Sequence, residues 1–167
     1  MLEVRLSAVR VDIESHTPVI FLQEAGGERS LPIFIGAAEA TAIAYAIQNM
    51  AVPRPMTHDL LRDVVDALGA TVEHVVVTEV RDATYYAELH LLRAGAAVVV
   101  SARPSDAVAL AARTGSRIFV ADELMDASGV VLDEEEDDDD EPEEGSEEIV
   151  GEFLEFLDNV RPEDFSA

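Results

Sequence analysis

The order of short apolar segments repeats along this chain of 167 residues, and the repetition limits the possible folds more than any single motif does. In each half, three strand-like segments precede an alanine-rich segment with helical character. When residues 35–44 are aligned with residues 102–111, Glu39 coincides with Asp106, and several alanines also coincide. We infer a duplicated unit of three strands followed by helices. The sequence therefore predicts an α+β fold, in which a mixed or antiparallel sheet packs against helices.

The first unit begins with three expected strands, at residues 2–13, 18–24 and 31–36. A phase slip in the alternation near Val9 predicts a β-bulge in the first of them. Residues 37–50 are rich in alanine, which favours a helix and permits its close packing on a sheet.

A second helix is expected at residues 58–68, with Thr57 as its N-cap and Gly69 at its end. The spacing of its apolar residues is typical of an amphipathic helix. One face of this helix contains Leu60, Leu61, Val64, Val65 and Leu68.

The second unit repeats the pattern. Its expected strands are residues 71–80, 85–92 and 97–102. A helix is expected at 104–114 and should end at Gly115, because glycine readily adopts the left-handed conformation found after helices. A short strand at 117–121 and a helical turn or two at 122–128 follow.

Charge divides the chain into three parts. Residues 1–132 contain 17 acidic residues and ten arginines and form the expected folded domain. Residues 133–148 are almost entirely acidic and are expected to be a disordered linker, because such a segment is too charged to collapse. Residues 149–167 contain a short amphipathic helix and tail, with Ile149, Phe153, Phe156, Leu157 and Val160 on one helical face. This helix either docks on the body or on a second subunit, or it is a peptide that binds another partner.

Composition excludes several classes of protein. The chain has no cysteine, so disulfides, thiolate zinc sites and cysteine nucleophiles are excluded. No apolar run approaches the roughly 20 residues needed to span a bilayer, so we expect a soluble, cytoplasmic protein without a membrane partner. The mildly acidic body argues against non-specific binding of nucleic acid but leaves room for a local arginine cluster.

The stretch from Arg103 to Asp106 has two interpretations. As a structural feature, Ser105 is an N-cap, Pro104 stops the helix from extending backward, and Asp106 meets the positive end of the helix dipole. As a functional corner, it presents a cation, a hydroxyl and a carboxylate at a strand-to-helix turn. The structural interpretation leaves Arg103 unexplained.

Two further groups combine charged and polar side chains. Arg54, His58 and Asp59 form either a stiff loop with a solvated first helical turn, or a phosphate-binding cation beside an acid or base and a metal or water ligand. Tyr86 and Glu88 share one strand face with His90 and form either an ordinary solvent-exposed face or one wall of a site.

Four segments of the chain together resemble one known family, the bifunctional nuclease domain family. They are LPIFIGAAEATAIAYAI, RPMTHDLLRDVVDALGA, VVVTEVRDATYYAEL and ARPSDAVALAARTGSRIFVADELMD, and they lie in the family's order between residues 2 and 127. The resemblance implies an α+β fold with two similar halves and nuclease activity on DNA and RNA. Many bacterial relatives end in a UVR motif, whereas this chain has the acidic run and short helix instead.

The resemblance also implies which residues form the site. Matched by motif, the catalytic positions are His58, Asp59, Glu88, Arg103, Ser105 and Asp106; the substrate-binding positions are Arg54, Tyr86 and Arg103; and the metal ligands are Glu39 and Asp106. On this interpretation Glu39 and Asp106 hold a divalent ion such as Mg²⁺ or Mn²⁺ that activates water. Arg103 and Arg54 bind the phosphate, and His58 is the general acid or base. The two helix starts must then converge.

The competing interpretation is a non-catalytic binding or regulatory module, in which the arginines and Asp106 form structural ion pairs and the tail helix recruits a partner. A third possibility combines the two, because the polyanionic tail of a nuclease can mimic nucleic acid and suppress its activity. An alanine-rich domain with a separate amphipathic helix also makes a homodimer or another homo-oligomer the expected assembly.

Overall fold

A computed structural model describes residues 1–13 and 15–131 of the chain. The expected acidic linker at 133–148 and the expected C-terminal helix at 149–167 lie outside the described residues. Among the residues it describes, no helix has both the length and the apolar content needed to cross a bilayer.

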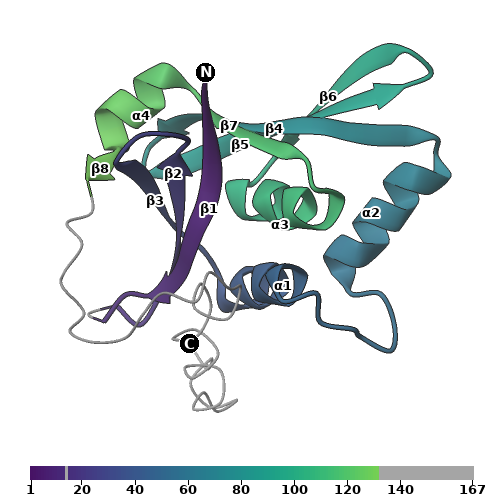
Figure 1. Cartoon of the computed structure of the whole chain (residues 1–167), viewed down its shortest axis with the longest axis horizontal. Helices are drawn as coiled ribbons and strands as arrows, with labels where there is room; N and C mark the ends of the chain where they lie inside the picture. The colour runs from purple at the N-terminus through teal and green to yellow at the C-terminus, as the bar shows by residue number, and fades with distance from the viewer. Residues whose placement is uncertain (14, 132–167) are drawn as a thin grey trace.

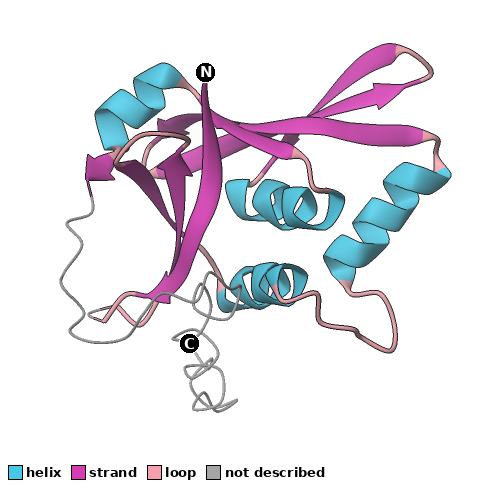
Figure 2. Cartoon of the chain, in the orientation of Figure 1, coloured by secondary structure: helices cyan, strands magenta, loops and turns pink. Residues whose placement is uncertain are grey.

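Two antiparallel meanders and a central strand form one mixed sheet. The first meander consists of β1 (Leu2–Val11), β2 (Pro18–Glu24) and β3 (Arg29–Phe34), and the second of β4 (Ala70–Arg81), β5 (Thr84–Arg93) and β6 (Ala96–Ala102). Strand β7 (Arg117–Val120) joins them, because it pairs parallel to β4 and antiparallel to β1. A two-residue strand, β8 (Val130–Val131), pairs with β3, so the described strand order is β6-β5-β4-β7-β1-β2-β3-β8. The predicted α+β class with a mixed sheet is confirmed (Figure 2).

Helix α3 (Pro104–Thr114) is the centre of the packing, between the second meander and two other helices. It contacts β4, β5 and β7 on one side, and α1 (Ala37–Ile47) and α2 (Thr57–Ala67) on others. Figure 1 shows β1 descending beside α3 and α1, while β4 and β7 run across above α3. The fourth described helix, α4 (Asp122–Ser128), lies near β3 and β8 at the other end of the sheet.

The core depends on small side chains in α1 and α3. Ala40 and Ala44 of α1 and Ala107 and Ala111 of α3 are all buried, so the backbones of the two helices can approach closely. Larger side chains fill the remaining space, with Leu110 fully buried. Burying a leucine side chain of this kind stabilises a fold by about 1.5–3 kcal/mol. The two starts of these helices are therefore held at fixed positions relative to one another.

Strand β1 separates from β7 after a short pairing. Only Leu2–Val4 pair with β7, through Ile118–Val120, while the rest of β1 continues along β2. A register shift between Leu6 and Ala8 interrupts the β1–β2 ladder, close to the bulge that the sequence predicts near Val9. Beyond Val4, the edge of β1 opposite β2 therefore has no strand beside it in the described part of the chain, and it faces the ends of α1 and α3.

The helix starts correct two predictions about N-caps. Arg103, not Ser105, is the N-cap of α3, and Pro104 is its first residue. Proline is well suited to that position because its fixed φ is helical and the backbone N–H it lacks would have no partner there. Met56, not Thr57, is the N-cap of α2, and its backbone N–H donates to the Asp59 carboxylate. Thr57 is the first residue of α2, and the side chain of Asp59 accepts a hydrogen bond from the backbone N–H of Met56.

Helix α2 is covered differently from the prediction. Of the five apolar residues predicted on one face, Val65 is buried, whereas Leu60, Leu61, Val64 and Leu68 are exposed. His58 is the other buried residue of this helix. The reason is that α2 lies at the end of the helical layer and contacts only α3 and β4 closely, so most of its apolar face has no neighbour in the described part of the chain.

Candidate active site

The first turns of α1 and α3 each place a carboxylate at the same helical position. Glu39 is the third residue after the N-cap Gly36, and Asp106 is the third residue after the N-cap Arg103. Both positions favour a negative charge, because the free N–H groups of a helix start carry a partial positive charge. The alignment of the two halves thus pairs residues that are equivalent in the structure.

Arg103 joins these two carboxylates. Its Nη2 lies 2.9 Å from Glu39 Oε1 and 3.1 Å from Asp106 Oδ1, and its Nε donates to Asp106 Oδ2 at 2.7 Å. Because both carboxylates contact the same nitrogen, the two helix starts converge, as the nuclease interpretation requires. The Arg103 side chain is nevertheless 66% exposed, so the guanidinium faces solvent on its other side.

His58 approaches Asp106 from α2. Its Nε2 lies 2.9 Å from Asp106 Oδ1, and the residue is only 7% exposed. A carboxylate only accepts hydrogen bonds, so Nε2 carries the proton in this contact. Nδ1 is buried and has no hydrogen-bond partner among the described residues, which is consistent with an unprotonated nitrogen there. We call Glu39, His58, Arg103 and Asp106 the carboxylate–arginine cluster.

The electrostatics of this cluster keep Asp106 ionised. Burial raises the pKa of its carboxyl, but hydrogen bonds from Arg103 and His58 outweigh burial, so the pKa lies below the ordinary value. The same contacts, led by Asp106, raise the pKa of the Arg103 guanidinium. The cluster is therefore a fixed arrangement of two anions around one exposed cation.

Asp59 lies next to His58 in sequence but forms a different contact. Its Oδ1 accepts a hydrogen bond from Arg113 Nε at 2.6 Å, and the Arg113 side chain is only 4% exposed. Arg113 Nη1 also donates to the Ala109 carbonyl oxygen at 2.9 Å. This buried ion pair fixes the start of α2 against α3 and thereby positions His58. Arg113 is not among the site residues predicted from the sequence, although an arginine within an alanine-rich helix that packs in the core indicates that an acidic partner is needed.

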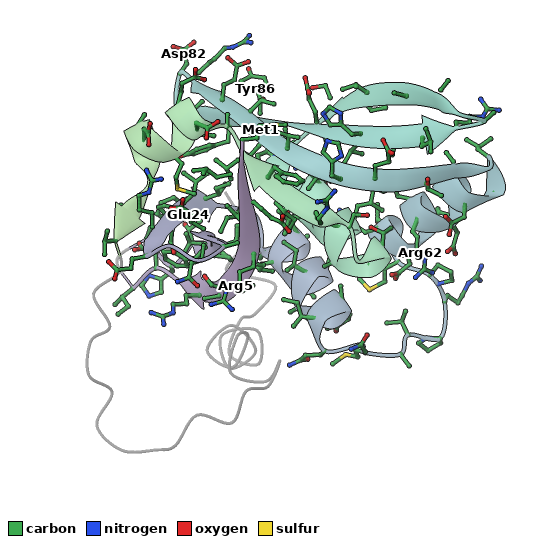
Figure 3. All side chains as sticks on the ribbon, turned by 45° about the horizontal axis from the view of Figure 1, so that its top comes forward. Met1, Arg5, Glu24, Arg62, Asp82 and Tyr86 are labelled. Atoms are coloured by element: carbon green, nitrogen blue, oxygen red, sulfur yellow. The ribbon has the colours of Figure 1, made fainter. Side chains whose placement is uncertain are left out.

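Three of the other predicted site residues lie outside the cluster. Arg54 is exposed in the loop between α1 and α2. Tyr86 and Glu88 lie on β5, where the alternate residues Ala87 and Leu89 point into the core beside α3. Tyr86 and Glu88 therefore face the opposite side of the sheet, and Figure 3 shows Tyr86 near Asp82 at the β4–β5 turn, far from Arg62 on α2. The structure does not bring these three residues together with His58 or Asp106.

Ser105 lies beside the cluster without joining it. Ser105 lies in the first turn of α3 and is only 7% exposed, because the helix packs against its neighbours there. Its hydroxyl makes no hydrogen bond to the described residues, unlike the capping contact that the sequence predicts.

The outer face of β5 has its own small network. Glu88 Oε2 lies 3.2 Å from His90 Nε2, and the His90 ring stacks on His74 with centroids 4.3 Å apart. Partial burial, followed by the nearby His90, lowers the pKa of His74. In residues 1–13 and 15–131 no three His, Asp or Glu side chains surround a position that suits a metal ion, on this face or elsewhere.

Comparison with known proteins identifies the family of this chain. A family model described as the bifunctional nuclease domain matches residues 20–133, which include both helix starts and the whole second meander. The chain belongs to the bifunctional nuclease domain family.

The relatives fall into two groups. An uncharacterised protein of Mycobacterium tuberculosis (strain H37Rv) is 42% identical over 165 residues, covering 99% of this chain and 98% of that protein. Bifunctional nuclease 2 of Arabidopsis thaliana is 32% identical over 101 residues, which are 59% of this chain and 31% of that protein. Bifunctional nuclease 1 of Oryza sativa subsp. japonica is 27% identical over 105 residues, which are 61% of this chain and 32% of that protein. This chain therefore matches about a third of each plant protein and nearly all of the mycobacterial one.

Proposed function

We propose that the protein is a nuclease that hydrolyses phosphodiester bonds in DNA, RNA or both, with the carboxylate–arginine cluster as its reaction centre. Membership of the family and the names of the plant relatives support a nuclease. The single observation that carries the location is the convergence of Glu39 and Asp106 on the exposed guanidinium of Arg103. Among the described ion pairs, Arg29 also contacts two carboxylates, but its partner Asp126 has a side chain that is 69% exposed.

Arg103 is the residue best placed to bind substrate. Its planar guanidinium matches the two oxygens of a phosphate group, and its exposed side faces the solvent from which a nucleic acid arrives. A positive charge at this place stabilises the charge that develops on phosphate oxygens during hydrolysis. Arg54, from the exposed α1–α2 loop, is a second candidate phosphate contact, reached when substrate extends across that loop.

His58 and Asp106 have different access to substrate. The His58 side chain is 8% exposed, whereas that of Asp106 is 28% exposed, so the carboxylate rather than the imidazole meets the substrate. His58 then acts as a positioning residue that orients Asp106 by donating a hydrogen bond from Nε2. This assignment differs from a general acid or base role for His58, because such a group must reach the reacting atoms.

A divalent ion fits the chemistry of the two carboxylates. Glu39 and Asp106 already share one cation, the Arg103 guanidinium, and the low pKa of Asp106 keeps it ionised as a ligand must be. When bound, Mg²⁺ or Mn²⁺ supplies a Lewis acid and an activated water. Glu39 and Asp106 would hold the ion, and Arg103, released from them, would turn fully toward the phosphate.

One observation favours the alternative of a non-catalytic binding or regulatory module. Glu39, Asp106 and Arg103 satisfy one another's hydrogen bonds, and such a set fixes the two helix starts even without chemistry. The two functions predict different results for the same variant.

The test is cleavage of labelled single- and double-stranded DNA and RNA by the full chain, with Mg²⁺ or Mn²⁺ and with chelator. The decisive variant is Asp106→Asn, and its control is Asp66→Asn, which makes the same charge change at an exposed position of α2. Loss of one group that stabilises transition-state charge typically lowers the rate by about 10²–10³-fold.

We expect chelator-sensitive cleavage by the parent chain and by Asp66→Asn, and loss of it in Asp106→Asn at an unchanged circular dichroism spectrum. Equal cleavage by all three would place the chemistry elsewhere or in a contaminant. Absence of cleavage from the folded parent on every substrate would favour the non-catalytic module.

A further inference from the structure

A groove lies between β1, the start of β7 and the C-terminal ends of α1 and α3, on the side away from the carboxylate–arginine cluster. It opens where β1 leaves β7, and the ends of α1 and α3 form its floor. Its volume is about 480 Å³, within the range of sites that bind sizeable ligands. Leu6, Ile47, Ala111 and Ile118 give the groove an apolar lining, and Arg5 and Arg117 lie at its rim.

The two rim arginines differ from most other arginines of the body. Arg5 donates to the neutral side chain of Gln23 at 3.0 Å, and the Arg117 guanidinium lies 5.4 Å from the Phe119 ring. Neither forms an ion pair within residues 1–13 and 15–131. Both are exposed, and Figure 3 shows Arg5 on the lower part of β1. The groove therefore suits a ligand that is apolar in the middle and acidic at its side.

Residues 149–160 of the chain have this pattern. Ile149, Phe153, Phe156, Leu157 and Val160 recur at the spacing of one helical face. Glu148, Glu152 and Glu155 also recur at helical spacing, and they fall along one flank of that face. We propose that residues 149–160 dock as a helix into this groove of their own chain, with the aromatic side chains on its apolar floor and the glutamates toward Arg5 and Arg117.

Charge distinguishes this groove from the exposed apolar stripe on α2. The stripe on α2 formed by Leu60, Leu61, Val64 and Leu68 belongs to a helix with more acidic than basic side chains, since Asp59, Asp63 and Asp66 outnumber Arg62. These carboxylates repel an acidic helix, whereas the groove has arginines at its rim. An acidic amphipathic segment should therefore prefer the groove.

The length of the chain also permits this docking. Seventeen residues, 132–148, connect the end of β8 to the segment, and extended chain of that length spans up to about 55–60 Å. A body of this size has a radius of gyration of about 14 Å, so the segment reaches any part of its surface. The alignment with the mycobacterial relative continues through this region, beyond the matched family domain at 20–133.

The absence of cysteine makes a direct test simple, because one introduced cysteine takes a single label. A nitroxide on Asn159→Cys in the full chain reports which backbone amides lie nearby, through broadening of their NMR signals. We expect strong broadening at Gly115 and Ser116 of the groove and little at Leu61 and Val64 of α2. The double substitution Phe153→Ser and Phe156→Ser in the labelled chain should abolish the broadening, and it should lower the Tm by several degrees.

Charge reversal at the rim separates this docking from unspecific hydrophobic contact. Arg117→Glu should weaken the broadening at Gly115, and adding Glu152→Arg should restore part of it, whereas Arg81→Glu, on β4, should have no effect. Broadening that is centred on α2, or that is absent everywhere, would overturn the proposal. Broadening that arises only between labelled and unlabelled chains would overturn docking within one chain and identify the groove as an interface between copies.

Discussion

At the scale of single residues, the contact between Asp59 and Arg113 holds the start of α2 against α3 and thereby positions His58 in the candidate site. His58 and Asp59 are neighbours at the start of α2, and they bind opposite ends of α3 through Asp106 and Arg113. Because the Arg113 side chain is only 4% exposed, its charge is poorly compensated by water when the aspartate is changed. The Asp59–Arg113 ion pair therefore contributes to the stability of the fold as well as to the position of His58.

Asp59→Asn should lower the free energy of unfolding by about 2–4 kcal/mol, because it leaves a buried guanidinium without its counter-charge. Asp63→Asn is the matched control, since its contact with Arg62 is exposed and is worth at most about 1 kcal/mol. Urea denaturation of both variants measures the difference. Equal stabilities of the two variants would show that the Asp59–Arg113 contact contributes no more than a surface pair.

The same residue gives a prediction about pH. Burial raises the pKa of Asp59, but the Arg113 and Met56 hydrogen bonds outweigh it, so the folded pKa lies below the ordinary 3.8. A depressed folded pKa contributes stability that is fully present above the unfolded pKa and is lost as the pH falls through the folded one. The stability difference between the parent chain and Asp59→Asn should therefore be constant at neutral pH and shrink below about pH 4. Urea midpoints measured from neutral pH to pH 3 check this, and a difference that stays constant throughout would contradict it.

The sequence predicts a contact between distant residues only where they occupy equivalent positions in the two halves of the repeat. Glu39 and Asp106 align because each is the third residue of an equivalent helix, and the structure brings both to Arg103. Strand alternation also places Tyr86 and Glu88 on one face, but it does not say on which side of the sheet α3 packs. The partner of Asp59 is 54 positions away in sequence, and no local pattern connects the two residues.

At the scale of elements, helix ends with distinctive backbone chemistry are predicted best. The expected bounds of α3 agree with the structure because Pro104 begins the helix and Gly115 ends it with a φ of 68°. The amphipathic pattern of α2 predicts a helix correctly, yet periodicity identifies an apolar face without showing what covers it. Strand β8 has only two residues, which is too short to produce any alternation.

Strand β6 forms one end of the described sheet, and its composition favours pairing with a second copy. Residues 96–102 contain no charge and no proline, and Val98, Val99 and Val100 are all exposed. Exposed edge strands normally carry charges or proline, which prevent edge-to-edge association. Antiparallel pairing of β6 with its own copy brings no like charges together, which suits a chain of net charge −24 and the expected homo-oligomer.

Val99→Lys should therefore weaken self-association of the full chain, because it places two like charges opposite each other across the two-fold axis. Val131→Lys, at the opposite end of the sheet, is the control that changes an exposed valine in the same way. Sedimentation velocity over a range of concentrations compares the two variants with the parent. A parent chain that is monomeric throughout, or equal effects of both lysines, would exclude β6 as the interface.

At the scale of the whole molecule, charge is distributed very unevenly. Residues 133–167 contain 18 acidic residues and one arginine, so they account for most of the net charge of −24. The described body holds ten arginines, and five of them pair with carboxylates within it. A polyanion attached to a domain that binds nucleic acid competes with that ligand for the remaining arginines and repels it at longer range. The tail should therefore reduce the affinity of the body for nucleic acid.

Neutralising part of the linker tests this effect without shortening the chain. The variant in which Asp137, Asp138, Asp139 and Asp140 are all asparagine should bind a labelled single-stranded oligonucleotide a few-fold more tightly than the parent at low salt, measured by fluorescence anisotropy. The difference should vanish near 1 M salt, where the screening length is only about 3 Å. A control variant with Glu28 and Asp82, exposed acids in turns of the body, changed to their amides removes two charges from the body and should bind more nearly like the parent. Equal affinity of the parent and the linker variant at low salt would show that the acidic tail does not compete with nucleic acid, and its charge would then need a different explanation.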